Sequence, residues 1–103
     1  MLEILPASKH FRNQSKGHVA VKDGMLMIYL HSRQAVVQWA VDTYTKILAR
    51  QLEIETLEPR VLQDAIQAVE YAVQAAQRKT YAQHQVLERA RARLQALDLP
   101  LAA

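Results

Sequence analysis

The sequence contains no cysteine, and glycine and proline are scarce, with 2 and 3 residues among 103. The absence of cysteine excludes disulfides and thiolate metal ligands, and it is typical of proteins in a reducing compartment. The longest strongly apolar run, Met25–Leu30, is too short to cross a bilayer, and the N-terminus has no basic region followed by an apolar core. Alanine, leucine, glutamine, arginine and glutamate are abundant, which favours helices. We therefore expect one helical domain of a cytoplasmic protein, with no membrane partner.

The charged residues are unevenly distributed along the chain. The net charge is +3, yet residues 1–22 and 78–93 are basic whereas residues 42–70 are acidic. Such polarity can orient a charged partner, and nucleic acid is one candidate. The alternative is that both basic stretches are only solvated surfaces. The cations that would contact nucleic acid are Lys9, Arg12, Lys16, Arg78, Lys79, Arg89 and Arg93.

The N-terminal third of the sequence allows more than one interpretation. Residues 1–17 show no periodicity and contain a long polar run, which predicts a flexible basic arm ahead of a single helical domain over residues 18–103. In residues 18–30, apolar segments flank Asp23-Gly24, a dipeptide that readily adopts the positive φ angles of a tight turn. This pattern favours a β-hairpin. Alternatively, Asp23 is the N-cap of a helix that continues into the next segment.

Apolar residues at spacings of three and four predict helices over residues 33–52 and 58–97. In the second helix they form a seam like that of a coiled coil, interrupted only by Thr80 and Gln83. These two residues either set the register of the seam through hydrogen bonds or mark where it meets water. The expected fold is mainly α: an antiparallel helical hairpin with one long C-terminal helix, preceded by a short β-hairpin or an irregular arm.

The predicted helices differ in length, and this difference predicts a partner. A helix over residues 58–97 would be about 60 Å long, and one over residues 33–52 about 30 Å. The shorter helix would leave half of the seam uncovered. A homodimer, forming a dimeric helical bundle, is the simplest remedy because one patch then serves both subunits. Tyr71 and Tyr81 lie off the seam and are candidates for contact with an unidentified protein partner. The interface along the seam would contain Leu62, Ile66, Val69, Val73, Leu87, Leu94 and Leu97.

The sequence contains no strong catalytic motif. It has no glycine-rich phosphate loop and no paired-histidine motif, and its 4 histidines are scattered over separate segments. We therefore expect no metal, no cofactor and no enzymatic activity.

A short stretch of the predicted long helix carries one resemblance. Arg78 is followed by His84, which resembles the R-x(4–6)-H motif of HEPN-type ribonucleases, a family of helical dimers. The resemblance implies that Arg78 orients phosphate and that His84 takes part in acid–base chemistry. It covers seven residues, Arg78 to His84, and the customary polar residue after the arginine is here Lys79.

Taken together, these patterns predict a non-enzymatic helical interaction module. It would be an adaptor, a chaperone-like protein or a regulatory subunit that acts through self-association and partner binding. A small basic DNA- or RNA-binding regulator is the alternative, and a HEPN-like ribonuclease is a more distant one.

Overall fold

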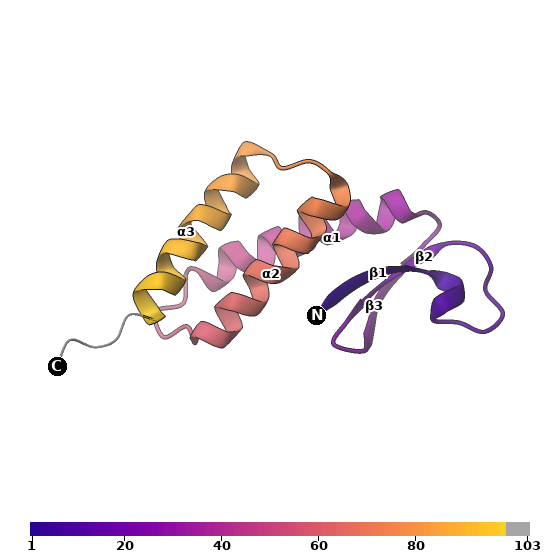
Figure 1. Cartoon of the computed structure of the whole chain (residues 1–103), viewed down its shortest axis with the longest axis horizontal. Helices are drawn as coiled ribbons and strands as arrows, with labels where there is room; N and C mark the ends of the chain where they lie inside the picture. Colours follow the sequence, from indigo (N-terminus) through magenta and orange to yellow (C-terminus); the bar gives the residue numbers. More distant parts are fainter. Residues whose placement is uncertain (99–103) are drawn as a thin grey trace.

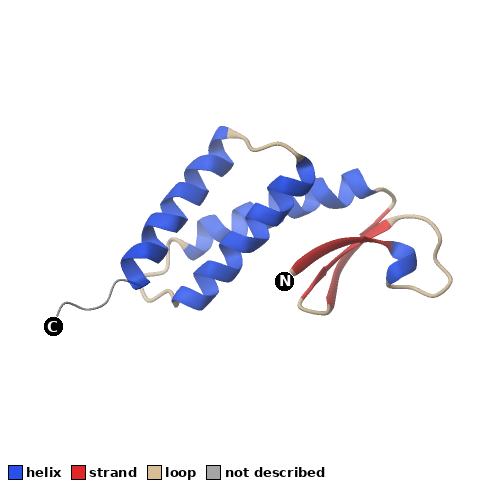
Figure 2. Cartoon of the chain, viewed as in Figure 1, coloured by secondary structure: helices blue, strands red, loops and turns tan. Residues whose placement is uncertain are grey.

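The computed structural model describes residues 1–98 and shows a mixed α/β fold (Figure 1 and Figure 2). The sheet lies at one end of the molecule and the last helix at the other (Figure 1). The expectation of a mainly α helical hairpin is therefore wrong. Residues 99–103, the end of the predicted domain, lie outside the described residues. In chain order the elements are β1 (Leu2–Pro6), a 3-10 turn η1 (Ala7–Lys9), β2 (His18–Lys22), β3 (Met25–Leu30), α1 (Arg33–Gln51), α2 (Pro59–Ala76) and α3 (Tyr81–Asp98).

The three strands form one antiparallel sheet in the order β1-β2-β3. The first strand lies within residues 1–17, where the sequence predicted only an irregular arm. The sequence Leu2–Pro6 has two adjacent apolar residues followed by proline and so lacks the strict alternation of a strand, and pairing with β2 defines β1. Pro6 pairs with His18, and His18 pairs with Leu30. The segments that leave β1 and β3 therefore start from the same end of the sheet.

Residues 18–30 form the predicted β-hairpin and not a helix capped by Asp23. Asp23 and Gly24 connect β2 to β3 with φ angles of 52° and 82°. Positive φ at both central residues matches the right-handed twist of the two strands, and the Asp-Gly sequence tolerates it. A register shift between Ala20 and Val21 places an irregularity opposite the middle of β3.

Both faces of the sheet carry buried residues, although β3 stays largely exposed. On the side of the helices, Leu2 and Ala20 are buried in the main core with residues of α1 and α2. On the other side, Val19 and Val21 are buried beneath the connection between β1 and β2, which contributes Ala7 and the partly buried Phe11. The residues preceding β2 are thus packed against the sheet.

The predicted long helix over residues 58–97 is wrong because the chain breaks after Ala76. Gln77 adopts the left-handed conformation with a φ of 55°. Its N–H donates to the carbonyl of Gln74 (3.0 Å), and the N–H of Arg78 donates to the carbonyl of Val73 (3.3 Å). These bonds form a Schellman motif, which satisfies the last carbonyls of α2 and ends the helix.

The next helix begins with a capping box. The N–H of Gln83 donates to Thr80 Oγ1 (3.3 Å), while the N–H of Thr80 donates to Gln83 Oε1 (2.8 Å). This reciprocal pair satisfies the free N–H groups at the start of α3. Thr80 and Gln83, the two polar residues that interrupt the predicted seam, therefore mark the start of a helix.

The break lets α3 fold back, so the chain covers most of its own seam. Leu87 is only 1% exposed and belongs to the same core as Leu62, Ile66 and Val69. Leu94 is half-buried, and only Leu97, at 38% exposure, lies largely outside this core. An uncovered seam is therefore no longer a reason to expect a homodimer.

We expect Thr80→Ala to lower the free energy of unfolding by about 1 kcal/mol, because it removes the side-chain oxygen of the N-cap. Thr56→Ala is the matched control, since Thr56 precedes Glu58, the N-cap of α2, and Glu58 makes no side-chain cap bond. Urea unfolding followed by circular dichroism measures both changes. Equal effects of the two substitutions would contradict the capping box.

An ion pair joins the sheet to α2. Lys22 Nζ lies 2.7 Å from Asp64 Oδ2, and only 18% of the Lys22 side chain is exposed. The hydrogen bond to Asp64 raises the pKa of Lys22 above its ordinary value of 10.5. A group whose pKa rises on folding contributes stability below its unfolded pKa, and the contribution is lost as pH rises through the folded pKa.

We therefore expect wild type to be more stable than Asp64→Asn at neutral pH. The difference should shrink as the pH is raised beyond the ordinary lysine pKa of 10.5. Urea unfolding of both proteins over that pH range provides the measurement. A difference that stays constant through alkaline pH would show that Lys22 is not the group responsible.

No helix within residues 1–98 combines the length and the hydrophobicity that crossing a membrane requires.

Candidate nucleic-acid interface

Unpaired cations gather at the end of the sheet where β1 stops and β3 leads into α1. The connection Ala7–Gly17 starts and returns at this end and carries Lys9, Arg12 and Lys16. The first residue of α1, Arg33, follows closely after β3. All four side chains are exposed, and within residues 1–98 none of them forms an ion pair with a carboxylate. Their charge is therefore available to a ligand.

Three aromatic rings lie among these cations. The rings of His10 and Phe11 meet edge to face at 4.9 Å, and Phe11 lies 5.6 Å from Tyr29 at an interplanar angle of 32°. Phe11 stands between Lys9 and Arg12 in the sequence, so the rings and the charges share one surface.

Hydrogen bonds hold Tyr29 in this position. Its hydroxyl donates to the carbonyl of Lys16 (3.0 Å) and accepts a bond from the side-chain amide of Gln14. Gly17 has a φ of +89°, and a Cβ at this position would lie 2.5 Å from Tyr29 Cε1. The absence of a side chain at Gly17 thus lets the connection close over the tyrosine ring.

The aromatic pair borders a hollow of about 320 Å³ on the sheet face that points away from the helices. The hollow is lined by Phe11, Asn13, Gln14 and Tyr29, and it contains no carboxylate. Tyr29 remains 39% exposed. An open aromatic surface with neighbouring amides and cations can stack against a planar base and contact its phosphate. We call this surface, formed by Lys9, His10, Phe11, Arg12, Asn13, Gln14, Lys16 and Tyr29, the aromatic platform.

The other cations predicted for nucleic-acid contact have different surroundings. Arg78 and Lys79 lie in the connection between α2 and α3, and Arg89 lies on α3; all three are exposed. Arg93 donates to the backbone carbonyls of the α1–α2 connection, including that of Glu55 at 3.2 Å. Arg93 therefore stabilises the fold and is not free for a ligand.

The two tyrosines predicted as partner contacts also differ. The Tyr71 hydroxyl accepts a hydrogen bond from the N–H of Ile4 (2.8 Å) and so satisfies part of the outer edge of β1. Tyr81 is 77% exposed, and its hydroxyl accepts a bond from Gln85 (2.6 Å). Of these two tyrosines, only Tyr81 is largely exposed.

The residues that resemble the ribonuclease motif are not on one helix. Arg78 lies in the α2–α3 connection, whereas His84 lies in the first turns of α3, and both are exposed. No hydrogen bond links them in the described part of the chain. Residues 1–98 also contain no group of three or more His, Cys, Asp or Glu side chains placed to hold a metal ion.

Sequence reasoning identified the cations of the basic end but missed Phe11, Tyr29 and Arg33. A readable pattern existed for Phe11, because aromatic residues interleaved with cations are typical of nucleic-acid surfaces. Tyr29 joins Phe11 only through the pairing of β2 with β3. No protein family, curated protein or solved structure matches this chain.

Proposed function

We propose that this chain is a non-enzymatic protein that binds single-stranded nucleic acid on the aromatic platform. The observation that supports this function is the open Phe11–Tyr29 pair, bordered by three cations that have no carboxylate partner in the described residues: Lys9, Arg12 and Lys16. Stacking supplies affinity for any base, and the cations displace counterions from the phosphates.

The form of the surface favours a single strand over a duplex. A ring pair can stack only on a base that is not already stacked and paired within a helix. The platform lies on a sheet face and a connecting segment, and it has no helix placed to enter a major groove. The Asn13 amide and the Gln14 side-chain oxygen can accompany stacking with hydrogen bonds to a base edge, while the Gln14 amide nitrogen donates to Tyr29.

Fluorescence anisotropy with labelled oligothymidylate of about eight nucleotides tests this function, since single-strand binding surfaces of small domains cover about 4–16 nucleotides. We expect saturable binding at low salt that weakens as salt is raised, and weaker binding to a duplex of the same length. No binding to the single strand at low salt would refute the proposed function.

Replacing Phe11 with leucine is expected to weaken binding of the same oligonucleotide by about 5- to 160-fold, because one stacked base contributes about 1–3 kcal/mol. Leucine keeps an apolar side chain against Val19 and Val21, so the fold should persist. Leu26→Ala is the control, because Leu26 is an exposed apolar residue of β3 outside the hollow. If Phe11→Leu binds like wild type, the ring does not stack on a base.

Self-association is a second candidate function, favoured by a different surface. A groove of about 220 Å³ between β3, α1 and α2 has exposed apolar residues at its rim: Met27, Ile47 and Val61. Met25 projects beside it, is 69% exposed and pairs with Lys22, which also lines the groove. We propose a second copy of the chain as the occupant. A two-fold axis would place each projecting Met25 against the groove of the other copy.

Light scattering over a wide range of protein concentration measures this association. We expect a dimer at high concentration, and a monomer when Ile47 is replaced with lysine. The predicted seam of α3 need not form this interface, since Val86, Leu87 and Ala90 are buried within the chain. A monomer at all concentrations would exclude the second candidate.

A further inference from the structure

A larger groove lies between the start of α1 and the end of α2, next to the basic end of the sheet. Its volume is about 620 Å³, and arginines stand at its two sides, Arg33 from α1 and Arg78 from the α2–α3 connection. An adjoining hollow of about 330 Å³ shares Arg33 and Gln74 with it and adds Tyr71. Four glutamines also line the larger groove: Gln34, Gln38, Gln74 and Gln77.

The electrostatic character of this groove favours an anion. Neither lining contains a carboxylate, and in the described residues neither Arg33 nor Arg78 has a carboxylate partner. One lining residue is bonded to an acidic group, because the side-chain amide of Gln38 donates to Asp42 (3.0 Å). The glutamine amides add neutral donors and acceptors, which suit bases and sugars more than a second charge.

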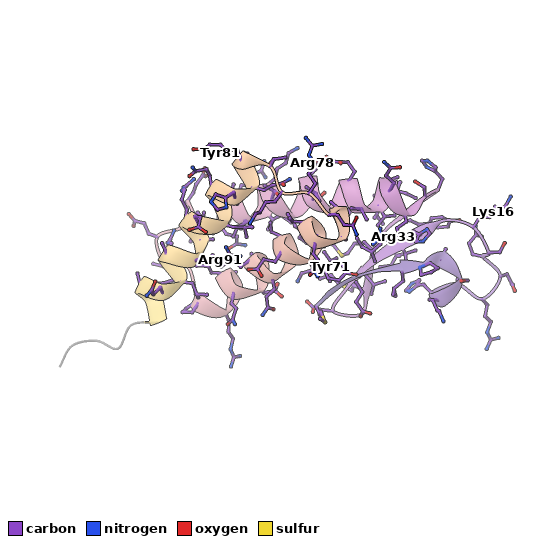
Figure 3. The ribbon with its side chains drawn as sticks, turned by 45° about the horizontal axis from the view of Figure 1, so that its top comes forward. Lys16, Arg33, Tyr71, Arg78, Tyr81 and Arg91 are labelled. Atoms are coloured by element: carbon purple, nitrogen blue, oxygen red, sulfur yellow. The ribbon has the colours of Figure 1, made fainter. Side chains whose placement is uncertain are left out.

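The groove and the aromatic platform share no lining residue and lie on different sides of the sheet, but both reach its basic end. Gly17 lies against the backbone of Leu30, because a Cβ on Gly17 would be 2.8 Å from the Leu30 carbonyl oxygen. Lys16 and the start of α1 are therefore neighbours at the same end of the sheet. In Figure 3, Arg33 is drawn between Arg78 and Lys16 along the long axis of the molecule.

We propose that the groove between Arg33 and Arg78 is a second phosphate-binding subsite, which holds the same nucleic-acid strand beyond the aromatic platform. This inference rests on the proposed function and specifies the ligand: single strands long enough to reach both places. Short strands occupy the platform alone, whereas longer ones gain two charge-assisted contacts to their phosphates.

Anisotropy titrations with oligothymidylates of about four and about twelve nucleotides test the inference. Wild type should bind the longer strand more tightly and with a steeper salt dependence. The double variant Arg33→Gln/Arg78→Gln should bind the short strand like wild type. For the longer strand, its slope of log affinity against log salt should become shallower by about 1.4, at about 0.7 for each lost phosphate contact.

The variant Arg50→Gln/Arg60→Gln is the matched control, because it removes two exposed arginines near the α1–α2 connection. This control should bind the longer strand more tightly than the short one by the same factor as wild type. If Arg33→Gln/Arg78→Gln still binds the longer strand more tightly than the short one by the wild-type factor, the subsite is overturned. It is also overturned if the control loses that gain in affinity equally. Either result leaves the platform in place. If wild type binds neither strand, the proposed function and the subsite are both refuted. If it binds neither strand but binds polyglutamate tightly, the groove is assigned to an acidic protein segment.

Discussion

Leu87→Ala is expected to lower the free energy of unfolding by about 2–5 kcal/mol, the usual range for a leucine removed from a packed core. Leu87 is 1% exposed and packs in the core that α1 and α2 share with α3. Loss of its side chain leaves a cavity that helices fixed by caps at both ends of the α2–α3 connection can fill only in part. Urea or thermal unfolding measures the change.

Leu97→Ala is the matched control for this prediction. Leu97 occupies an equivalent position of the predicted seam but is 38% exposed, so its replacement should lower the free energy of unfolding by less than about 1 kcal/mol. In one long helix paired along its whole length, the two leucines would contribute alike. Similar losses for Leu87→Ala and Leu97→Ala would therefore contradict a folded-back α3.

The triple variant Lys9→Gln/Arg12→Gln/Lys16→Gln is expected to weaken nucleic-acid binding and to remove most of its salt dependence. Each lost phosphate contact should make the slope of log affinity against log salt shallower by about 0.7, or about 2 for all three. Between 50 and 200 mM salt, a slope difference of that size means that wild type loses about 20-fold more affinity than the variant does. Anisotropy with the short oligothymidylate measures affinity and slope together.

A variant with the same change in net charge separates local contacts from general attraction. Lys46→Gln/Arg50→Gln/Arg60→Gln removes three exposed cations of α1 and α2 outside the aromatic platform. It should bind almost like wild type. All six residues are exposed, so the stability of both variants should stay within about 0.5 kcal/mol of wild type. Equal losses of binding would show that overall charge, and not the platform, attracts the oligonucleotide.

The sequence predicted those local features of the fold that depend on a few adjacent residues. Asp23-Gly24 indicated the turn between β2 and β3, because few other dipeptides accept positive φ at both positions. The apolar spacing indicated a helix over residues 33–52, and α1 spans Arg33–Gln51. The strand β1 was not readable, since it exists only through its partner β2.

The break between α2 and α3 was missed because periodicity continues through it. The apolar residues of α3 follow those of α2 at the spacing of one unbroken helix, although a turn separates them. The readable evidence was polar: Gln77-Arg78-Lys79-Thr80 contains no apolar residue, and Thr80 with Gln83 has the spacing of a capping box. A capping box within a run of polar residues therefore indicates a helix boundary even where the apolar spacing continues.

The candidate site was predictable in its charges and not in its shape. Uneven charge indicated Lys9, Arg12 and Lys16, since charge is a property of composition. The contact of Phe11 with Tyr29 depends on the β2–β3 register and on Gly17. The shared groove of Arg33 and Arg78 depends on the antiparallel packing of α1 and α2, which local sequence patterns do not specify.

The most direct test of the central claim is an amide NMR titration of the wild-type chain with the short oligothymidylate. Binding on the aromatic platform predicts chemical-shift changes concentrated in residues 9–17 and at Tyr29, with little change around Ile47 and Val61. Changes centred on the apolar groove of Ile47 and Val61, or no change at low salt, would contradict it.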